Sequence, residues 1–241
     1  MRVIRFLTVF LVVFAMDTGG YAEEKRWDYQ AELSFVDTGG NSDVTSLSVK
    51  NTLKYKFTEK LFSNWKVSAL YGKSGGKKNA ENYFTALRLD YSITEQFYVS
   101  AITGWQKDEF AGIDSMYYLG PSVGYKFLTG HKHLLLGEAG LRYVGEEYTN
   151  DTDKDYLSSR AFAKYEYPFT EKNKVSQSLE FLCDFKDSND YNLNSETALI
   201  SAFSNVFSLK ASYVIRFDNQ PVPSTLKKTD TVLALTLIAN F

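Results

Sequence analysis

Two histidines stand two residues apart, so they are the first residues to test for catalysis or metal binding. His131 and His133 lie in the segment Thr129-Gly-His-Lys-His133. Hydrolysis of a lipid by a serine nucleophile requires a histidine base that a third polar group orients, and no serine stands beside this pair at two-residue spacing. A zinc site needs at least a third ligand, and none is close in sequence. We expect a surface turn here, with no catalytic residue, cofactor or metal ion.

Five acidic residues gather further along the chain and raise the question of a calcium site. Ca²⁺ takes several oxygen ligands at short range, and an Asp-x-Asp-x-Asp pattern offers them. The glycine and the closing glutamate of an EF-hand loop are missing, however. We therefore expect a solvated acidic loop that contains Glu146, Glu147, Asp151, Asp153 and Asp155.

The elements that position these residues follow from the hydrophobic pattern, which is clearest at the C-terminus. Between Thr229 and Phe241, Leu233, Leu235 and Leu237 alternate with smaller or polar residues. A period of two indicates an extended strand, because successive side chains leave a strand on opposite sides. Eleven other segments alternate in the same way. The expected strands are 27–38, 44–57, 62–73, 81–93, 97–108, 114–127, 133–147, 154–167, 173–187, 191–203, 206–217 and 229–241.

The connections between these segments are of two kinds, which alternate along the chain. One kind is a short repeated turn, such as Phe57-Thr-Glu-Lys-Leu61 or Phe169-Thr-Glu-Lys-Asn173; the other is generally longer and more polar, such as Asp218 to Lys228. Short turns on one side and longer loops on the other are typical of outer-membrane barrels. With an even number of strands, both termini of the chain then lie on the short-turn side.

Aromatic residues on the apolar face gather at two levels. Trp27 and Tyr55 represent those at the short-turn ends of the strands, and Phe35 and Tyr143 those toward the opposite ends. Two such levels match the two interfaces of a bilayer, whereas a soluble sandwich would spread its aromatic residues through the core. The sequence therefore predicts an all-β fold, an antiparallel up-and-down transmembrane β-barrel of about twelve strands.

Charged residues occupy the face opposite to the apolar one. A soluble barrel could not bury so many charges at reasonable cost, but in a membrane barrel this face is the lumen, where water or mutual pairing satisfies it. Two ion pairs are conceivable, Glu138 with Arg142 and Arg160 with Glu180, although simple filling of the lumen explains the same residues. The expected lumen-lining residues are Arg88, Glu138, Arg142, Arg160, Glu180, Lys210 and Arg216.

The first 22 residues have the features of a secretory signal peptide. Arg2 and Arg5 precede the apolar run 6–16, and Gly20 and Ala22 supply small residues for a cleavage site. That run is shorter than the roughly 20 residues of a spanning helix. We expect a signal peptide at 1–22 and a single outer-membrane barrel domain at 23–241. The near balance of 27 basic and 29 acidic residues argues against nucleic-acid binding. The single Cys183 excludes an intramolecular disulfide.

Particular motifs resemble a known family. Gly40-Asn-Ser-Asp43, Ala80-Glu-Asn-Tyr83, Leu119-Gly-Pro-Ser-Val-Gly-Tyr125 and Ser195-Glu-Thr-Ala-Leu199 are similar to successive hairpins of the DUF481 family of salt-induced outer-membrane proteins. The best match is Asn219-Gln-Pro-Val-Pro223, which leads into the last strand. The resemblance runs from about Tyr29 to Phe241. It implies an outer-membrane barrel, and it supplies no catalytic residue.

We therefore expect a protein of the bacterial outer membrane, a small passive channel or an envelope-structural barrel without catalysis. The alternative is an enzyme that modifies lipid or lipopolysaccharide. Expected partners are outer-membrane lipid, lipopolysaccharide and the assembly machinery. The terminal Phe241 resembles the signal that this machinery recognises. The oligomeric state is left open. Lysine should be costly at Leu235, on the lipid face, and mild at Thr236, on the lumen face.

Overall fold

The computed structural model describes residues 26–39, 44–74 and 77–241. The expected signal peptide and the motif at 40–43 lie outside these residues. Within the described part of the chain, no helix is long and apolar enough to cross a membrane. The described residues form twelve strands: β1 (Trp27–Gly39), β2 (Val44–Lys56), β3 (Leu61–Ser74), β4 (Lys77–Ser92), β5 (Phe97–Asp108), β6 (Ile113–Thr129), β7 (Leu134–Tyr148), β8 (Asp153–Pro168), β9 (Asn173–Asp184), β10 (Tyr191–Ala202), β11 (Phe207–Asp218) and β12 (Thr229–Asn240).

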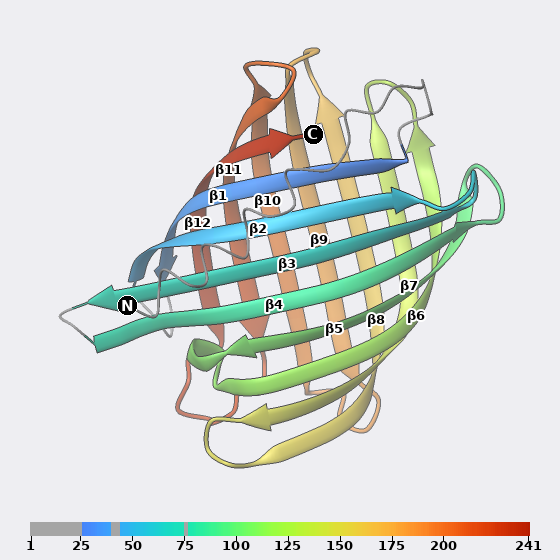
Figure 1. Ribbon diagram of the computed structural model, residues 1–241. Coiled ribbons are helices and arrows are strands. Elements are labelled where there is room, and N and C mark those ends of the chain that lie inside the picture. The colour runs from blue at the N-terminus through green and yellow to red at the C-terminus, as the bar shows by residue number, and fades with distance from the viewer. Residues whose placement is uncertain (1–25, 40–43, 75–76) are drawn as a thin grey trace.

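The strands close into one antiparallel barrel in which each strand pairs with its neighbours in sequence. The seam joins β1 to β12, where Leu33 lies opposite Leu237 and Ser34 opposite Thr236. Figure 1 shows β2 to β5 crossing in front of β9 to β11 at a steep angle, as the tilt of strands in a closed barrel requires. The predicted fold class is confirmed, and closure leaves none of the twelve described strands with an unpaired edge.

The two faces of the sheet differ as the alternation predicts. On the outside, Phe35 and Leu235 are 56% and 50% exposed, whereas their interior neighbours Val36 and Thr236 are 3% and 2% exposed. The inner wall is built from polar and charged side chains, and buried serines are frequent among them. The apolar side chains that would form the core of a soluble protein thus cover the outer surface of this barrel.

Short turns of one kind join the strands at one end of the barrel, called here the turn end. In the turn 57–60, the Thr58 hydroxyl accepts hydrogen bonds from the backbone N–H groups of Lys60 and Leu61. Thr94, Thr170 and Ser204 do the same in the turns 93–96, 169–172 and 203–206. A hydroxyl that bonds to backbone two and three residues on fixes a tight turn. This bonding explains the repeated sequence.

The opposite end, called here the loop end, departs from the expected boundaries. The β7–β8 connection contains only residues 149–152, because β7 and β8 each continue one residue beyond the expected limits of 147 and 154. Glu146 and Glu147 lie in β7 opposite Lys154 and Asp153 of β8. The acidic loop expected from the sequence is therefore largely a pair of strand ends. Only Asp151 of its acidic residues lies in the turn, with a φ of 63°.

Candidate functional site

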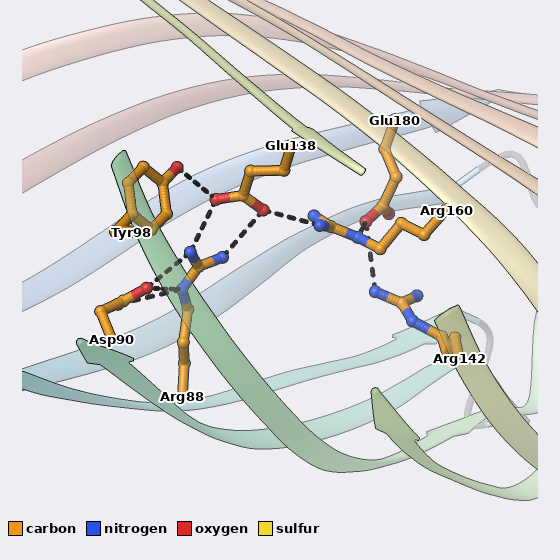
Figure 2. Close-up of polar contacts among 7 residues, drawn as sticks. All are labelled: Arg88, Asp90, Tyr98, Glu138, Arg142, Arg160 and Glu180. Carbon is orange, nitrogen blue, oxygen red and sulfur yellow. Dashed lines mark hydrogen bonds and ion pairs between the residues drawn. The ribbon is translucent and has the colours of Figure 1, made fainter. Parts of the chain in front are cut away.

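The Glu138 carboxylate on β7 is one of the least exposed charged groups of the described barrel interior. Its side chain is 2% exposed. Arg88, from β4, donates to both of its oxygens, from Nη2 to Oε1 at 2.6 Å and from Nη1 to Oε2 at 3.1 Å. Arg160, from β8, donates to Oε2 at 2.7 Å, and the Tyr98 hydroxyl, from β5, donates to Oε1 at 2.8 Å. Figure 2 shows the carboxylate between the two guanidinium groups. Four donors thus satisfy one buried charge.

The contacts extend from both arginines to further carboxylates. The Arg88 guanidinium also donates to Asp90, with distances of 2.7–3.0 Å. Arg160 Nε donates to Glu180 Oε1 at 2.6 Å, and Arg142 Nη2 donates to the same oxygen at 3.2 Å. We call Arg88, Asp90, Tyr98, Glu138, Arg142, Arg160 and Glu180 the interior network; Figure 2 draws these residues. It contains three arginines and three carboxylates, so it is neutral as a unit.

Small residues on the strands between β4 and β7 give Arg88 room to reach Glu138. Ser100 on β5 and Ser122 on β6 are buried on the inner wall, where they lie opposite each other. Gly124 on β6 lies opposite Tyr98, and a Cβ atom at Gly124 would be 2.1 Å from the ring of Tyr98. A close approach of this kind requires glycine. The tyrosine therefore lies flat on the wall and presents its hydroxyl to Glu138.

Aromatic rings also support the other two arginines. The Arg142 guanidinium carbon lies 4.6 Å from the ring centre of Tyr118, and that of Arg160 lies 5.0 Å from the ring centre of Phe162. A guanidinium over an aromatic face gains electrostatic attraction and packing. Tyr118 in turn covers Gly104, where a Cβ atom would be 2.5 Å from the tyrosine ring. The network is thus held in position by rings as well as by ion pairs.

The remaining expected lumen residues lie outside the network. Lys210, on β11, forms an ion pair with Glu196 of β10. Arg216, also on β11, lies 3.5 Å from Asp108 of β5. Five of the seven expected lumen residues thus meet in one set of contacts, and two make separate pairs.

One of the two pairings considered from the sequence is wrong. Glu138 and Arg142 both belong to β7, four residues apart, which separates their Cα atoms by about 13 Å along a strand. Glu138 instead contacts Arg88 and Arg160, while Arg142 contacts Glu180. The other pairing is present, since Arg160 contacts Glu180 across the β8–β9 pair.

Sequence reasoning did not single out Tyr98, Asp108 or Glu196. Tyr98 lies two positions from Ser100, so alternation places both side chains on the inner face. However, a tyrosine next to Phe97 at a short turn looks like another interfacial aromatic residue. Alternation along β5 and β10 also places Asp108 and Glu196 on the inner face, so this alternation was the signal by which they could have been found.

The histidine pair lies at the turn end, in the connection 130–133. His133 Nδ1 is 2.7 Å from the Tyr165 hydroxyl, and its ring stacks on Tyr167 with 5.1 Å between centres. The expectation that this segment is a surface turn is confirmed. The described residues contain no group of three or more histidine, cysteine, aspartate or glutamate side chains placed to hold a metal ion.

Residues 31–241 match the family described as a protein of unknown function, DUF481. The chain belongs to the DUF481 family. A relative from Escherichia coli (strain K12), the uncharacterized protein YdiY, is 24% identical over 225 residues, which cover 93% of this chain and 87% of YdiY. The family resemblance seen in the sequence is thereby confirmed.

Solved structures similar to this DUF481 chain are outer-membrane barrels. The NanC porin has a TM-score of 0.61 at 4% identity and covers 87% of this chain and 98% of its own. The translocator domain of the autotransporter NalP from Neisseria meningitidis has a TM-score of 0.59 at 13% identity and covers 100% and 96%. The COG4313 outer membrane channel from Pseudomonas putida F1 has a TM-score of 0.59 at 11% identity and covers 94% and 100%. At these identities the likeness concerns the fold alone.

Proposed function

We propose that this protein is a small passive channel of the bacterial outer membrane and that it carries out no catalysis. The observation that carries the proposal is the inversion of the barrel, which has an apolar outer surface and charged groups within. Lys54 and Lys66 line the inner wall and keep much of their surface accessible to water-sized molecules. An interior that holds solvated charge is one through which water and small solutes can pass.

The outer surface supports the location. Exposed aromatic residues at the turn end make ring contacts with one another, such as Tyr55 with Phe57 at 4.8 Å and Tyr125 with Phe127 at 5.1 Å between centres. A belt of this kind suits the interface between hydrocarbon and headgroups. Membrane lipid and lipopolysaccharide are then the partners of the outer wall. The assembly machinery is the partner of the C-terminal strand with Phe241.

The interior network supports a narrow channel. Twelve strands lie between the eight that side chains fill and the sixteen to eighteen that leave a wide aqueous channel. The network draws side chains from β4, β5, β7, β8 and β9 to common contacts, so it reduces the open cross-section at that height. We therefore propose that it forms the constriction.

No contact of the histidine pair favours the enzyme alternative. His133 has a tyrosine hydroxyl as its partner, where an activated serine would be needed. The same pair lies at the turn end, outside the interior network.

Planar-bilayer recording from the refolded, purified barrel tests the proposal. We expect discrete conductance steps that the heat-denatured protein does not produce. Removing Glu138 and Arg160 together, as Glu138→Ala with Arg160→Ala, should raise the step size because the constriction loses two large side chains. Electrical silence of the wild-type barrel at all voltages would contradict the channel and leave the envelope-structural role. Silence with turnover of phospholipid or lipid A would establish the enzyme alternative.

A further inference from the structure

We infer that the inner wall of β2, β3 and β4 carries a binding site for small polyvalent anions, with Lys66 at its centre. This inference rests on the proposed channel, which would bring solutes to the site. The ligands in question bear carboxylate or phosphate groups.

The register of the strands gathers cations around Lys66. Lys66 on β3 lies opposite Thr52 on β2, and Lys50 and Lys54 are the residues two positions either side of Thr52 on the same face. Arg88 on β4 lies opposite Asn64, two positions from Lys66. Diagonal neighbours of this kind are separated by about 7–8 Å. Lys66 thus has three cationic diagonal neighbours.

A further cation comes from the opposite wall. Lys164 lies on β8, which is five strands away from β3, the strand of Lys66, in the closed order of twelve. Its charge nevertheless acts on Lys66 together with the charges of Lys50 and Arg88, and against these three the charge of Glu32 acts in the opposite sense. Lysines of opposite walls therefore share one region of the lumen, and an anion between them would face cations on both sides.

The carboxylates of this region are already engaged. Glu32 accepts from Lys50 at 2.6 Å, Glu166 accepts from Lys164 at 2.6 Å, and Glu196 pairs with Lys210. Asp90 and Glu138 are held by Arg88. Among the residues that the structure describes, Lys54 and Lys66 make no side-chain hydrogen bond or ion pair. Lys54 and Lys66 therefore remain without an ion pair in the described part of the barrel, although Asp28 lies opposite Lys54 in the β1–β2 register and the charge of Glu32 acts on Lys66.

Unpaired like charges in a narrow lumen favour an ion that neutralises several of them at once. A divalent or trivalent anion gains from each lysine, whereas chloride gains from one at a time. Flexible ammonium groups with three donors each suit carboxylate and phosphate oxygens alike. The site therefore discriminates among anions mainly by their charge, and the shape of the anion is a secondary criterion.

Two probes, citrate and pyrophosphate, test the site and separate its two candidate chemistries. Each is titrated against the chloride current through the refolded barrel, and each is titrated calorimetrically into the same barrel in detergent. We expect reversible block and matching binding by at least one probe. Lys66→Gln should weaken both by about fivefold, the effect of one partly screened charge, and Lys54→Gln with Lys66→Gln should weaken both further. Block by citrate alone identifies a carboxylate site, and block by pyrophosphate alone a phosphate site.

Lys172→Gln is the matched control. It removes the same charge from an exposed turn at the same end of the barrel, and it should change neither block nor binding. An equal loss of block and binding in Lys66→Gln and Lys172→Gln would overturn the proposed site. Absence of calorimetric binding of both probes to the wild-type barrel would overturn it as well. The calorimetric measurement does not need conductance. A silent barrel that binds citrate and loses it on Lys66→Gln would refute the channel and retain the anion site.

Discussion

Arg216 and Asp108 face each other across the full width of the barrel at the loop end, with Nη1 of Arg216 3.5 Å from Oδ2 of Asp108. Arg216 belongs to β11 and Asp108 to β5, and these strands are six positions apart in a closed order of twelve. Residues from opposite walls can meet only where the cross-section is narrow. The pair therefore joins two walls that share no backbone hydrogen bond.

Charge reversal should separate this pair from the interior network. Arg216 is half exposed and has one distant carboxylate, so Arg216→Glu should change folding stability by less than about 1 kcal/mol. Arg160 is 7% exposed and contacts two carboxylates. Arg160→Glu should cost about 3–5 kcal/mol, because it places a third carboxylate beside the buried Glu138 and Glu180 and leaves only Arg88 and Arg142 to neutralise them. Urea titration of the refolded barrels measures both changes.

The Arg216→Glu variant also tests the lumen. Arg216→Glu should fold normally and shift the reversal potential in a salt gradient toward cation selectivity, because it places two negative charges at the loop end. An unchanged reversal potential in a folded Arg216→Glu barrel would place the conduction path elsewhere.

Gly124→Ala should destabilise the barrel by about 1–3 kcal/mol, the usual cost of overpacking. The new Cβ atom would lie 2.1 Å from the Tyr98 ring, which must move and give up its 2.8 Å hydrogen bond to Glu138. Gly130→Ala is the control, because its Cβ atom would meet nothing closer than 3.9 Å. The temperature at which the folded band disappears on a gel compares the two. Equal temperatures would contradict the tyrosine-over-glycine contact.

Leu235→Lys should lower the yield of folded barrel, since a lysine on the lipid face costs roughly 2–4 kcal/mol at mid-membrane. Leu235 is 50% exposed on the outer surface. Leu235→Met keeps the surface apolar and should fold like the wild type. Heat-modifiable migration in isolated outer membranes gives the folded fraction, and equal yields for lysine and methionine would show that position 235 does not face lipid.

For Thr236→Lys the structure predicts a larger loss of folded barrel than the mild effect that alternation predicts. Thr236 does face inward, but it is 2% exposed and its hydroxyl lies 2.8 Å from that of Ser34 across the β1–β12 seam. A lysine there must displace this contact, so we expect loss of folded barrel at 236 as well. Thr236→Ser, which keeps the hydroxyl, should retain folding.

Deletion of Phe241 should impair assembly through two separable effects. The Phe241 N–H donates to the Tyr29 carbonyl at 2.8 Å, and Tyr29 N–H donates to Phe241 O at 3.1 Å, so the residue closes the seam. Its ring also lies 6.2 Å from that of Tyr29. Phe241→Ala keeps the backbone bonds and removes the ring. Refolding in detergent should then be close to normal, whereas assembly in cells should fall if the ring is the recognition signal. Normal assembly of Phe241→Ala would contradict that role.

The sequence by itself determined the strands, their faces and their number. Alternation is a local property, because each residue of a strand points to the side opposite from its neighbours. It therefore placed Leu235 outside and Glu138 inside without knowledge of the closed barrel. The repeated Phe-Thr-Glu-Lys turns were equally local, since the Thr58 hydroxyl bonds only within its own turn.

Only the tertiary structure decided which charges meet. Glu138 contacts Arg88, which lies three strands away with Gly124 and Ser122 on a strand between them, and Arg216 contacts Asp108 across the lumen. These contacts depend on strand tilt and on the stagger of a closed sheet, which no period-two pattern encodes. The strand ends at Tyr148 and Asp153 were set in the same way, because the β7–β8 pairing extends each strand by one residue into the polar segment that looked like a loop.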